Sequence, residues 1–144
     1  MTGESADQYA GPNDSDRETL YILAPHLMPL LDSADARPIH FVGIAGAGMS
    51  ALAELFLRRG VAITGCDAHP ETAGDLKRLG VDVTPHDPKH VDRARALVVT
   101  SAMPKDHPEL ARARELGVPV IRRAEALGEV TAGRELVGIA GTHG

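Results

Sequence analysis

The 144-residue sequence has little of several residue types that particular protein classes need. It has one cysteine, Cys66, so no disulfide can form within the chain, which suits a reducing cytoplasm. Aromatic residues make up 3% and tryptophan is absent, which argues against a platform that stacks nucleic-acid bases. The formal net charge of −5 likewise argues against a nucleic-acid partner.

The sequence also lacks a long uninterrupted hydrophobic run. Its most apolar early stretch, residues 20–31, is broken by Pro25, His26 and Pro29 and follows an acidic segment, unlike a membrane span or a signal peptide. Hydrophobic residues make up 43% and charged residues 24%, as in ordinary globular domains. We therefore expect a cytoplasmic protein, without a membrane partner, whose core is built from Val, Leu, Ile and Ala.

Short apolar runs alternate with helix-type segments from residue 39 onward. The runs predict strands at 39–44, 61–65, 81–84, 96–101 and 118–121, and helices at 50–59, 71–79, 107–116 and 124–131. This alternation predicts an α/β fold, a Rossmann-like doubly wound parallel sheet of about five strands in the order 3-2-1-4-5. We expect residues 1–37 to be a disordered leader with a short helix at 16–31, and residues 38–133 to be the Rossmann-like domain.

Three glycines follow the first predicted strand, at Gly43, Gly46 and Gly48, just ahead of Ser50. Glycines let the backbone turn tightly, and the helix that follows offers free N–H groups to a phosphate, with Ser50 as a candidate cap. The spacing is G-x-x-G-x-G, which weakens a dinucleotide interpretation. A tight turn that binds nothing is the alternative.

Few other residues point to chemistry by themselves. Asp67 follows the second predicted strand, where Rossmann domains carry a ribose-binding acid, although it could be a solvated turn residue. Cys66 is expected to be a small core residue rather than a reactive thiol. Four histidines show no metal-ligand spacing, so we expect solvated side chains and no metal site: His40, His69, His90 and His107.

The chain ends in an apolar run, with a sixth strand expected at 136–140, followed by Gly141, Thr142, His143 and Gly144. Such a run is how a P-loop begins, and the Lys and Ser/Thr that bind phosphate and Mg²⁺ would come next. Residues 134–144 are therefore expected to start a second, ATP-binding domain. We expect the front end of a larger nucleotide-using enzyme, which by itself binds rather than catalyses.

An ordered series of segments, covering residues 38–144, resembles the N-terminal domain of the Mur ligases of peptidoglycan synthesis. The segments are HFVGIAGAGMSALAEL, GCD, PHDPKHV, VVTSAMPKDHPEL, GVPVIRRAEAL and VGIAGTHG. The series is more specific than the glycine turn alone, and it is most similar to the members that add L-alanine to UDP-N-acetylmuramic acid.

The resemblance implies a three-domain enzyme in which the first domain binds the UDP part of UDP-N-acetylmuramic acid. The second domain would bind ATP and Mg²⁺, and the third would receive L-alanine, so no cofactor is expected in this chain. The muramyl carboxylate would be activated as an acyl phosphate, which the amine of L-alanine then attacks.

The resemblance also assigns residues. It places the diphosphate over Ala45, Gly46, Ala47, Gly48, Met49 and Ser50, with Asp67 near the uridine and His86 close to the nucleotide. Further matches are Thr100, Ser101 and Ala102 after the fourth strand, Arg122, Arg123 and Glu125 after the fifth, and Gly141 to Gly144 at the ATP loop. The chain departs from the family at Ala45, where glycine is usual, and at Pro85, where glycine or asparagine is frequent.

Three alternatives stay open. A related ligase that recycles whole peptides onto UDP-muramic acid carries similar motifs, although the serine-alanine step and the RRAE segment favour the alanine-adding enzyme. A nicotinamide-binding or ligand-sensing Rossmann module is a different class, opposed by the glycine spacing and the P-loop start. A regulatory remnant that binds UDP precursors without ligating them is the third.

Overall fold

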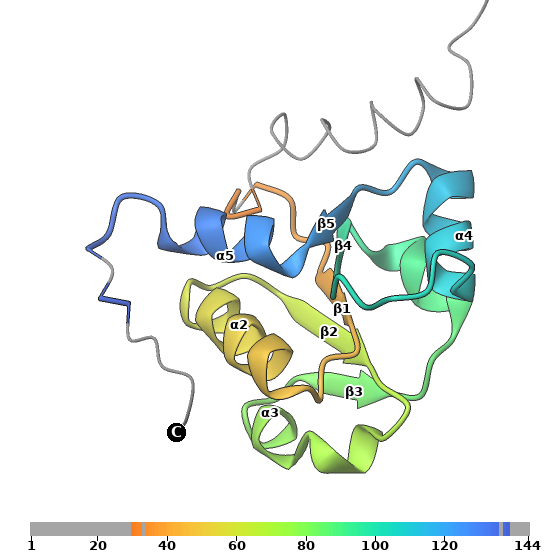
Figure 1. The fold of residues 1–144 in the computed structure, drawn as a ribbon, viewed down its shortest axis with the longest axis horizontal. Helices are drawn as coiled ribbons and strands as arrows, with labels where there is room; N and C mark the ends of the chain where they lie inside the picture. The colour runs from red at the N-terminus through yellow and green to blue at the C-terminus, as the bar shows by residue number, and fades with distance from the viewer. Residues whose placement is uncertain (1–29, 33, 136, 139–144) are drawn as a thin grey trace, which may run out of the picture.

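The computed structural model describes residues 30–32, 34–135 and 137–138, and its centre is a five-stranded parallel sheet (Figure 1). The strands lie in the order β3-β2-β1-β4-β5, which confirms the predicted fold and strand order. Their bounds are β1 (Ile39–Val42), β2 (Ile63–Cys66), β3 (Asp82–Thr84), β4 (Ala96–Val99) and β5 (Val120–Arg122).

Helical segments cover both faces of the sheet (Figure 1). They are α2 (Ala47–Arg58), α3 (Gly74–Arg78), α4 (Pro108–Leu116) and α5 (Arg123–Thr131), with 3-10 turns η2 (Pro70–Thr72) and η3 (Pro88–Arg93). One core cluster contains buried residues of α2, α3 and α5, and a second contains buried residues of η3 and α4. The second cluster therefore marks the opposite face of the sheet.

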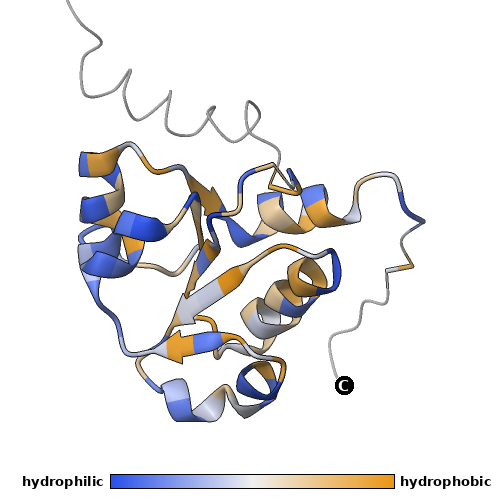
Figure 2. Cartoon of the chain, turned by 180° about the vertical axis from the view of Figure 1, so that it is seen from behind, coloured by the Kyte–Doolittle hydropathy of each residue, from blue (hydrophilic) through white to orange (hydrophobic). Residues whose placement is uncertain are grey.

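Strand alternation distributes the side chains between these two faces. In β1, Ile39 and Phe41 belong to the core under α2 and α5, whereas Val42 belongs to the core under η3 and α4. Ile63 and Cys66 of β2 divide in the same way. Hydrophobic residues accordingly run along the central strands, and hydrophilic residues predominate on the outer turns (Figure 2). The same alternation turns His40 toward η3 and α4.

Several predicted boundaries were wrong. The first helix begins at Ala47 rather than at residue 50, since the carbonyl of Gly46 already accepts from the N–H groups of Met49 and Ser50. The segment expected to be one helix at 71–79 is a 3-10 turn followed by the short α3, with Ala73 between them.

The fifth strand begins at Val120 instead of residue 118 because Val118 still closes the preceding helix. The N–H of Val118 donates to the carbonyl of Ala113 at 2.9 Å, and Gly117 takes a left-handed conformation with φ of 67°. Such an ending is a common way to satisfy the last carbonyls of a helix.

Some predictions fall outside the described residues: the leader and nearly all of the helix at 16–31, and the ATP-loop start at Gly141, Thr142, His143 and Gly144. Of the sixth strand expected at 136–140, only Val137 and Gly138 are described, and neither lies in a strand. Along the described ranges, no helix has the length and apolar character that a membrane crossing requires.

Candidate functional site

The glycine turn connects β1 to α2 at the carboxyl end of the sheet. Gly43 has a φ of +79°, which side-chain-bearing residues rarely adopt. The N–H groups of Gly43 and Ile44 donate to the carbonyl of Cys66 at 2.8 and 3.1 Å. The turn is therefore tied to the end of β2.

Asp67 fixes the next part of the turn with its carboxylate. Its Oδ2 accepts from the N–H of Ala45 at 2.9 Å, and its Oδ1 accepts from the N–H of His69 at 3.0 Å. Asp67 is thus not a merely solvated turn residue, because it holds the glycine turn against the end of β2. Ala45 fits in this turn because its φ is not positive: in the described ranges, only glycines have a positive φ.

In the first turn of α2, only some of the backbone N–H groups are available to hydrogen-bond an anion. The N–H groups of Met49 and Ser50 already donate to the carbonyl of Gly46, at 2.9 and 2.8 Å. Ala47 and Gly48 precede them in the helix; both residues are exposed, and their N–H groups have no intrahelical acceptor by position. Of the first four N–H groups of the helix, these two are left without a backbone acceptor within it.

Two predicted roles change with this geometry. The hydroxyl of Ser50 donates to the carbonyl of Ala47 at 3.1 Å, and Gly46 is the N-cap without a side-chain cap, so Ser50 does not cap the helix. The Met49 side chain is 2% exposed and packs in the core beneath the turn. The Met49 side chain is therefore a core side chain and does not contact the diphosphate that the resemblance places over this turn.

Arg123 lies directly against the glycine turn. A Cβ built on Gly48 would collide with a guanidinium nitrogen of Arg123, so the guanidinium occupies the space that a side chain at this position would need. Glu125 accepts from the N–H of Arg122 at 2.9 Å and fixes the start of α5. Of the two consecutive arginines, Arg123 is the one placed beside the exposed amides.

The segment after β4 borders the same turn. Thr100, Ser101 and Ala102 follow the strand directly, and the N–H of Met103 donates to the carbonyl of Thr100 at 3.2 Å. The Met103 methyl lies 4.0 Å from the position of a Cβ on Gly43. The sheet thus gathers these residues, the glycine turn, Asp67 and Arg123 at one edge.

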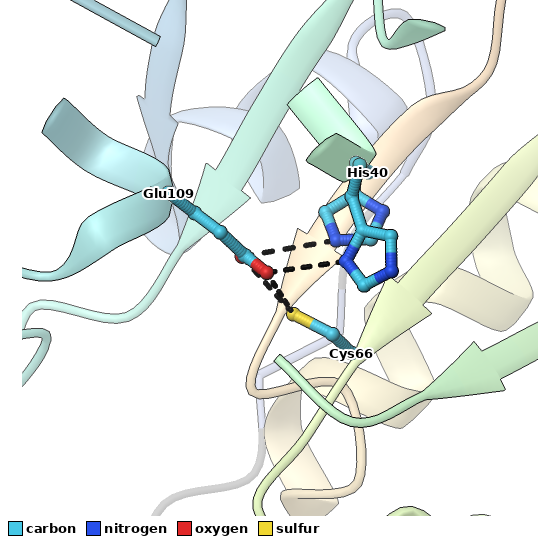
Figure 3. A group of neighbouring side chains, drawn as sticks. His40, Cys66 and Glu109 are labelled. Atoms are coloured by element: carbon cyan, nitrogen blue, oxygen red, sulfur yellow. Dashed lines mark hydrogen bonds and ion pairs between the residues drawn. The ribbon is translucent and has the colours of Figure 1, made fainter. Parts of the chain in front are cut away.

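A second group, which the sequence did not predict, is buried beneath η3 and α4. Figure 3 shows His40 and Cys66 directed toward the carboxylate of Glu109. The Cys66 thiol lies 3.1 Å from both carboxylate oxygens, and the N–H of Asp87 donates to Oε1 at 2.9 Å. Nδ1 of His90 lies 3.2 Å from the same oxygen.

The expectation of solvated histidines was wrong for His40, which is 1% exposed. His90 and His107 are half-buried, and His107 caps α4, whereas His69 is exposed as expected. Cys66 is buried, as predicted. His86 contacts this group, since its Nδ1 lies 3.0 Å from the Cys66 sulfur.

Burial dominates the electrostatics of the buried group. It lowers the pKa of His40 to about 4, against the opposing effect of Glu109, so this imidazole is neutral near pH 7. Burial also raises the pKa of the Cys66 thiol, and the hydrogen bond to Glu109 raises it further. The thiol is therefore protonated and donates to the carboxylate.

Strand periodicity could have revealed this group. Thr64 and Cys66 in β2, like His40 in β1, sit at alternate positions of strands that also carry apolar residues on the other face. Polar residues repeated on one face of neighbouring parallel strands indicate that a polar side chain from the helices covering that face pairs with them. The sequence did not predict that Glu109 belongs to this group, because its contact with β1 and β2 depends on where α4 packs on the sheet.

Comparisons with known proteins agree with this architecture. Residues 38–135 match a family model described as "Mur ligase family, catalytic domain". The UDP-N-acetylmuramate–L-alanine ligase of Acidothermus cellulolyticus is 50% identical over 107 residues, which cover 73% of this chain and 22% of the relative. Its counterpart in Streptomyces avermitilis is 46% identical over 121 residues, covering 82% and 26%. The chain spans about a quarter of the length of these curated relatives.

Solved structures show the same likeness. The UDP-N-acetylmuramate–alanine ligase of Thermotoga maritima matches with a TM-score of 0.59 and 33% identity, over 63% of this chain and 22% of that one. A UDP-N-acetylmuramate:L-alanyl-γ-D-glutamyl-meso-diaminopimelate ligase from Neisseria meningitides matches with a TM-score of 0.60 and 29% identity, over 66% and 31%. Because the family model covers most of the sequence, the chain belongs to the Mur ligase family.

Proposed function

We propose that this chain is the UDP-sugar-binding part of an ATP-dependent ligase that adds L-alanine to UDP-N-acetylmuramic acid in peptidoglycan synthesis. The observation that carries the proposal is the glycine turn, where two exposed helix-start amides lie beside the guanidinium of Arg123. The names of the curated relatives support the choice of substrate.

The diphosphate would sit on the N–H groups of Ala47 and Gly48. Helix N-termini favour anions through their free amides and the helix dipole, and Arg123 adds a charge that can form two parallel hydrogen bonds to phosphate oxygens. Asp67 would act mainly by positioning the turn, since both of its oxygens already accept from backbone N–H groups. Thr100, Ser101 and Ala102 would border the nucleotide on the β4 side.

In this account the described residues bind and orient the substrate, and none of them performs chemistry. A carboxylate is a poor electrophile until phosphorylation turns one of its oxygens into a leaving group, and that step needs ATP and Mg²⁺. The candidate ATP-loop residues, Gly141 to Gly144, lie outside the described residues. We expect cytoplasmic action, where the nucleotide substrates are available.

A second candidate is the ligase that attaches a preformed peptide to UDP-N-acetylmuramic acid. The backbone match to the Neisseria enzyme, with a TM-score of 0.60, is as good as that to the alanine ligase, with 0.59. Both candidates share the UDP-sugar and differ in the group that is added. The serine-alanine step at residues 101–102 and the RRAE segment favour the alanine-adding enzyme.

Calorimetric titration of the purified chain with UDP-N-acetylmuramic acid, with NAD and NADH in parallel, tests the proposal. We expect saturable binding of the UDP-sugar alone, with loss of binding in Gly48→Asp and weakening in Arg123→Ala and Asp67→Ala. Arg58→Ala is the matched control, because Arg58 is an exposed arginine near the opposite end of α2 and should leave affinity unchanged. Binding of the nicotinamide cofactor instead would contradict the proposal.

A further inference from the structure

Four side chains from four different elements converge on one point beneath α4. Each offers one ligand atom, and these atoms all lie within 4.8 Å of one another: His40, Cys66, His90 and Glu109. A tetrahedral zinc ion with bonds of 2.0–2.3 Å separates its ligand atoms by roughly 3.3–3.7 Å. The distances from the Glu109 carboxylate to Cys66, His90 and His40 are 3.1, 3.2 and 3.8 Å, so small side-chain shifts would bring them into this range.

Both histidines are held in an orientation that suits metal binding. Nδ1 of His40 lies 2.9 Å from the hydroxyl of Thr64, and Nε2 of His90 lies 3.0 Å from the hydroxyl of Thr84. Metal-ligating histidines almost always donate their second ring N–H to such an acceptor, which directs the other nitrogen at the ion. The two threonines therefore leave one nitrogen of each ring facing Glu109.

Two features of the group favour a bound cation. Nε2 of His40 has no hydrogen-bond partner among the described residues, although the side chain is 2% exposed and this atom points at Glu109, 3.8 Å away. Glu109 is fully buried, and within the described part of the chain no lysine or arginine pairs with it. Buried carboxylates ordinarily have a charged partner or coordinate a metal.

We infer that these four side chains form a binding site for one zinc ion. The ligand atoms would be Nε2 of His40, Sγ of Cys66 and a carboxylate oxygen of Glu109 (Figure 3), together with Nδ1 of His90. On binding, the thiol proton leaves to solvent and an S–Zn bond forms, and each histidine ligates through a neutral imidazole. Thiolate, carboxylate and Zn²⁺ then sum to zero charge. Imidazole with thiolate selects zinc over the oxygen-preferring Mg²⁺ and Ca²⁺.

The proposed ion would have a structural role in this domain. Cys66 joins the two regions, because its side chain enters the cluster while its carbonyl accepts from the N–H groups of Gly43 and Ile44. Zinc would therefore fix the end of β2 and, through it, the glycine turn. The inference stands independently of nucleotide binding, since every ligand lies on the face covered by η3 and α4.

Cobalt(II) titration of the untagged, chelator-treated protein tests the site, because tetrahedral thiolate coordination gives visible and near-ultraviolet absorption. We expect one saturable Co²⁺ per chain, displaced by Zn²⁺, with the charge-transfer band lost in Cys66→Ser. His90→Ala should weaken binding at least tenfold. Thr64→Val keeps all four ligands but removes the acceptor for His40, and should weaken binding about 10–100-fold.

His69→Ala is the matched control, because its ring is exposed and lies outside the cluster, and its affinity should equal that of the unmodified chain. Circular dichroism of each variant separates loss of the site from loss of the fold. The inference is overturned if the unmodified chain shows no saturable tetrahedral spectrum, or if folded Cys66→Ser and His90→Ala bind Co²⁺ with unchanged spectrum and affinity.

Discussion

The glycine turn and the buried cluster around Glu109 are anchored by adjacent residues, Asp67 and Cys66, at the end of β2, yet they are built in opposite ways. The turn offers exposed backbone amides, held by hydrogen bonds to Asp67 and to the carbonyl of Cys66. The cluster consists of buried and half-buried side chains that converge on the carboxylate of Glu109. Side-chain changes in the turn should therefore cost less folding stability than removal of one member of the buried polar group.

The largest loss of stability is expected on removal of the Glu109 carboxylate, which the other members of the cluster contact. Glu109→Ala leaves the Cys66 thiol and the N–H of Asp87 without their acceptor in a buried site. We expect a loss of about 3 kcal/mol or more in the free energy of unfolding, measured by urea denaturation. Glu115→Ala, on the exposed side of the same helix, should change it by less than about 0.5 kcal/mol. Equal effects of the two variants would contradict the account.

A smaller loss is expected where β2 packs against the turn. A Cβ at Gly65 would collide with three atoms of the Ile44 side chain, so Gly65→Ala should destabilise by about 1–3 kcal/mol through overpacking. It should also weaken UDP-sugar binding, because Ile44 belongs to the turn. Gly74→Ala is the control, since a Cβ there meets nothing within 4 Å. Thermal denaturation and calorimetry of both variants test this explanation. If the collision with Ile44 causes the loss of stability and affinity, Gly65→Ala should show both losses and Gly74→Ala neither.

The pH dependence of stability should come from the cluster rather than from the turn. The folded-state pKa of His40 is lowered to about 4, and that of His107 is also lowered by burial, so the unfolded chain binds more protons below pH 6.5. Stability should therefore fall as the pH falls from about 6.5 toward 4, by ~2 kcal/mol from His40 between pH 7 and 5. Urea denaturation midpoints, determined at several pH values in the presence of a chelator, measure this loss of stability.

His69→Gln removes an exposed histidine and should leave that slope unchanged. His40→Gln, if it folds, should flatten it. A slope that is the same in both variants would show that other groups control the acid response.

The smallest effect is expected at the anchor of the turn. Asp67→Asn replaces one carboxylate oxygen by an amide NH₂, so only one of the N–H groups of Ala45 and His69 keeps its acceptor. We expect a loss of about 1 kcal/mol and a reduced UDP-sugar affinity. Asp92→Asn affects only an exposed pair with Arg112 and should be near neutral in both measurements.

The fold was predictable because its signals are local. Short apolar runs alternate with helices along the chain, and right-handed crossovers leave few sheet orders to consider. The glycine turn was predictable for the same reason, since its residues are contiguous. The helix start at Ala47 was not, because it depends on the carbonyl of Gly46 accepting two hydrogen bonds that only the folded turn creates.

The buried cluster was only partly predictable from the sequence, for a geometric reason. His40 meets Glu109 only after β1 is placed in the sheet and α4 is packed across its face. The spacing of the histidines along the chain therefore led to the wrong prediction that His40 is solvated. Placing them on strand faces would have recovered part of the cluster, and Glu109 would still have required the position of the helix.

We propose that the amides of Ala47 and Gly48 bind the phosphates of a UDP-sugar, and amide NMR of the ¹⁵N-labelled chain can follow each of these two N–H groups separately. On titration with UDP-N-acetylmuramic acid, the account predicts the largest shifts at these two amides, with a change at the Arg123 side chain and no such response to NAD. Saturable binding with unchanged Ala47 and Gly48 signals, or the same shifts with NAD, would contradict it.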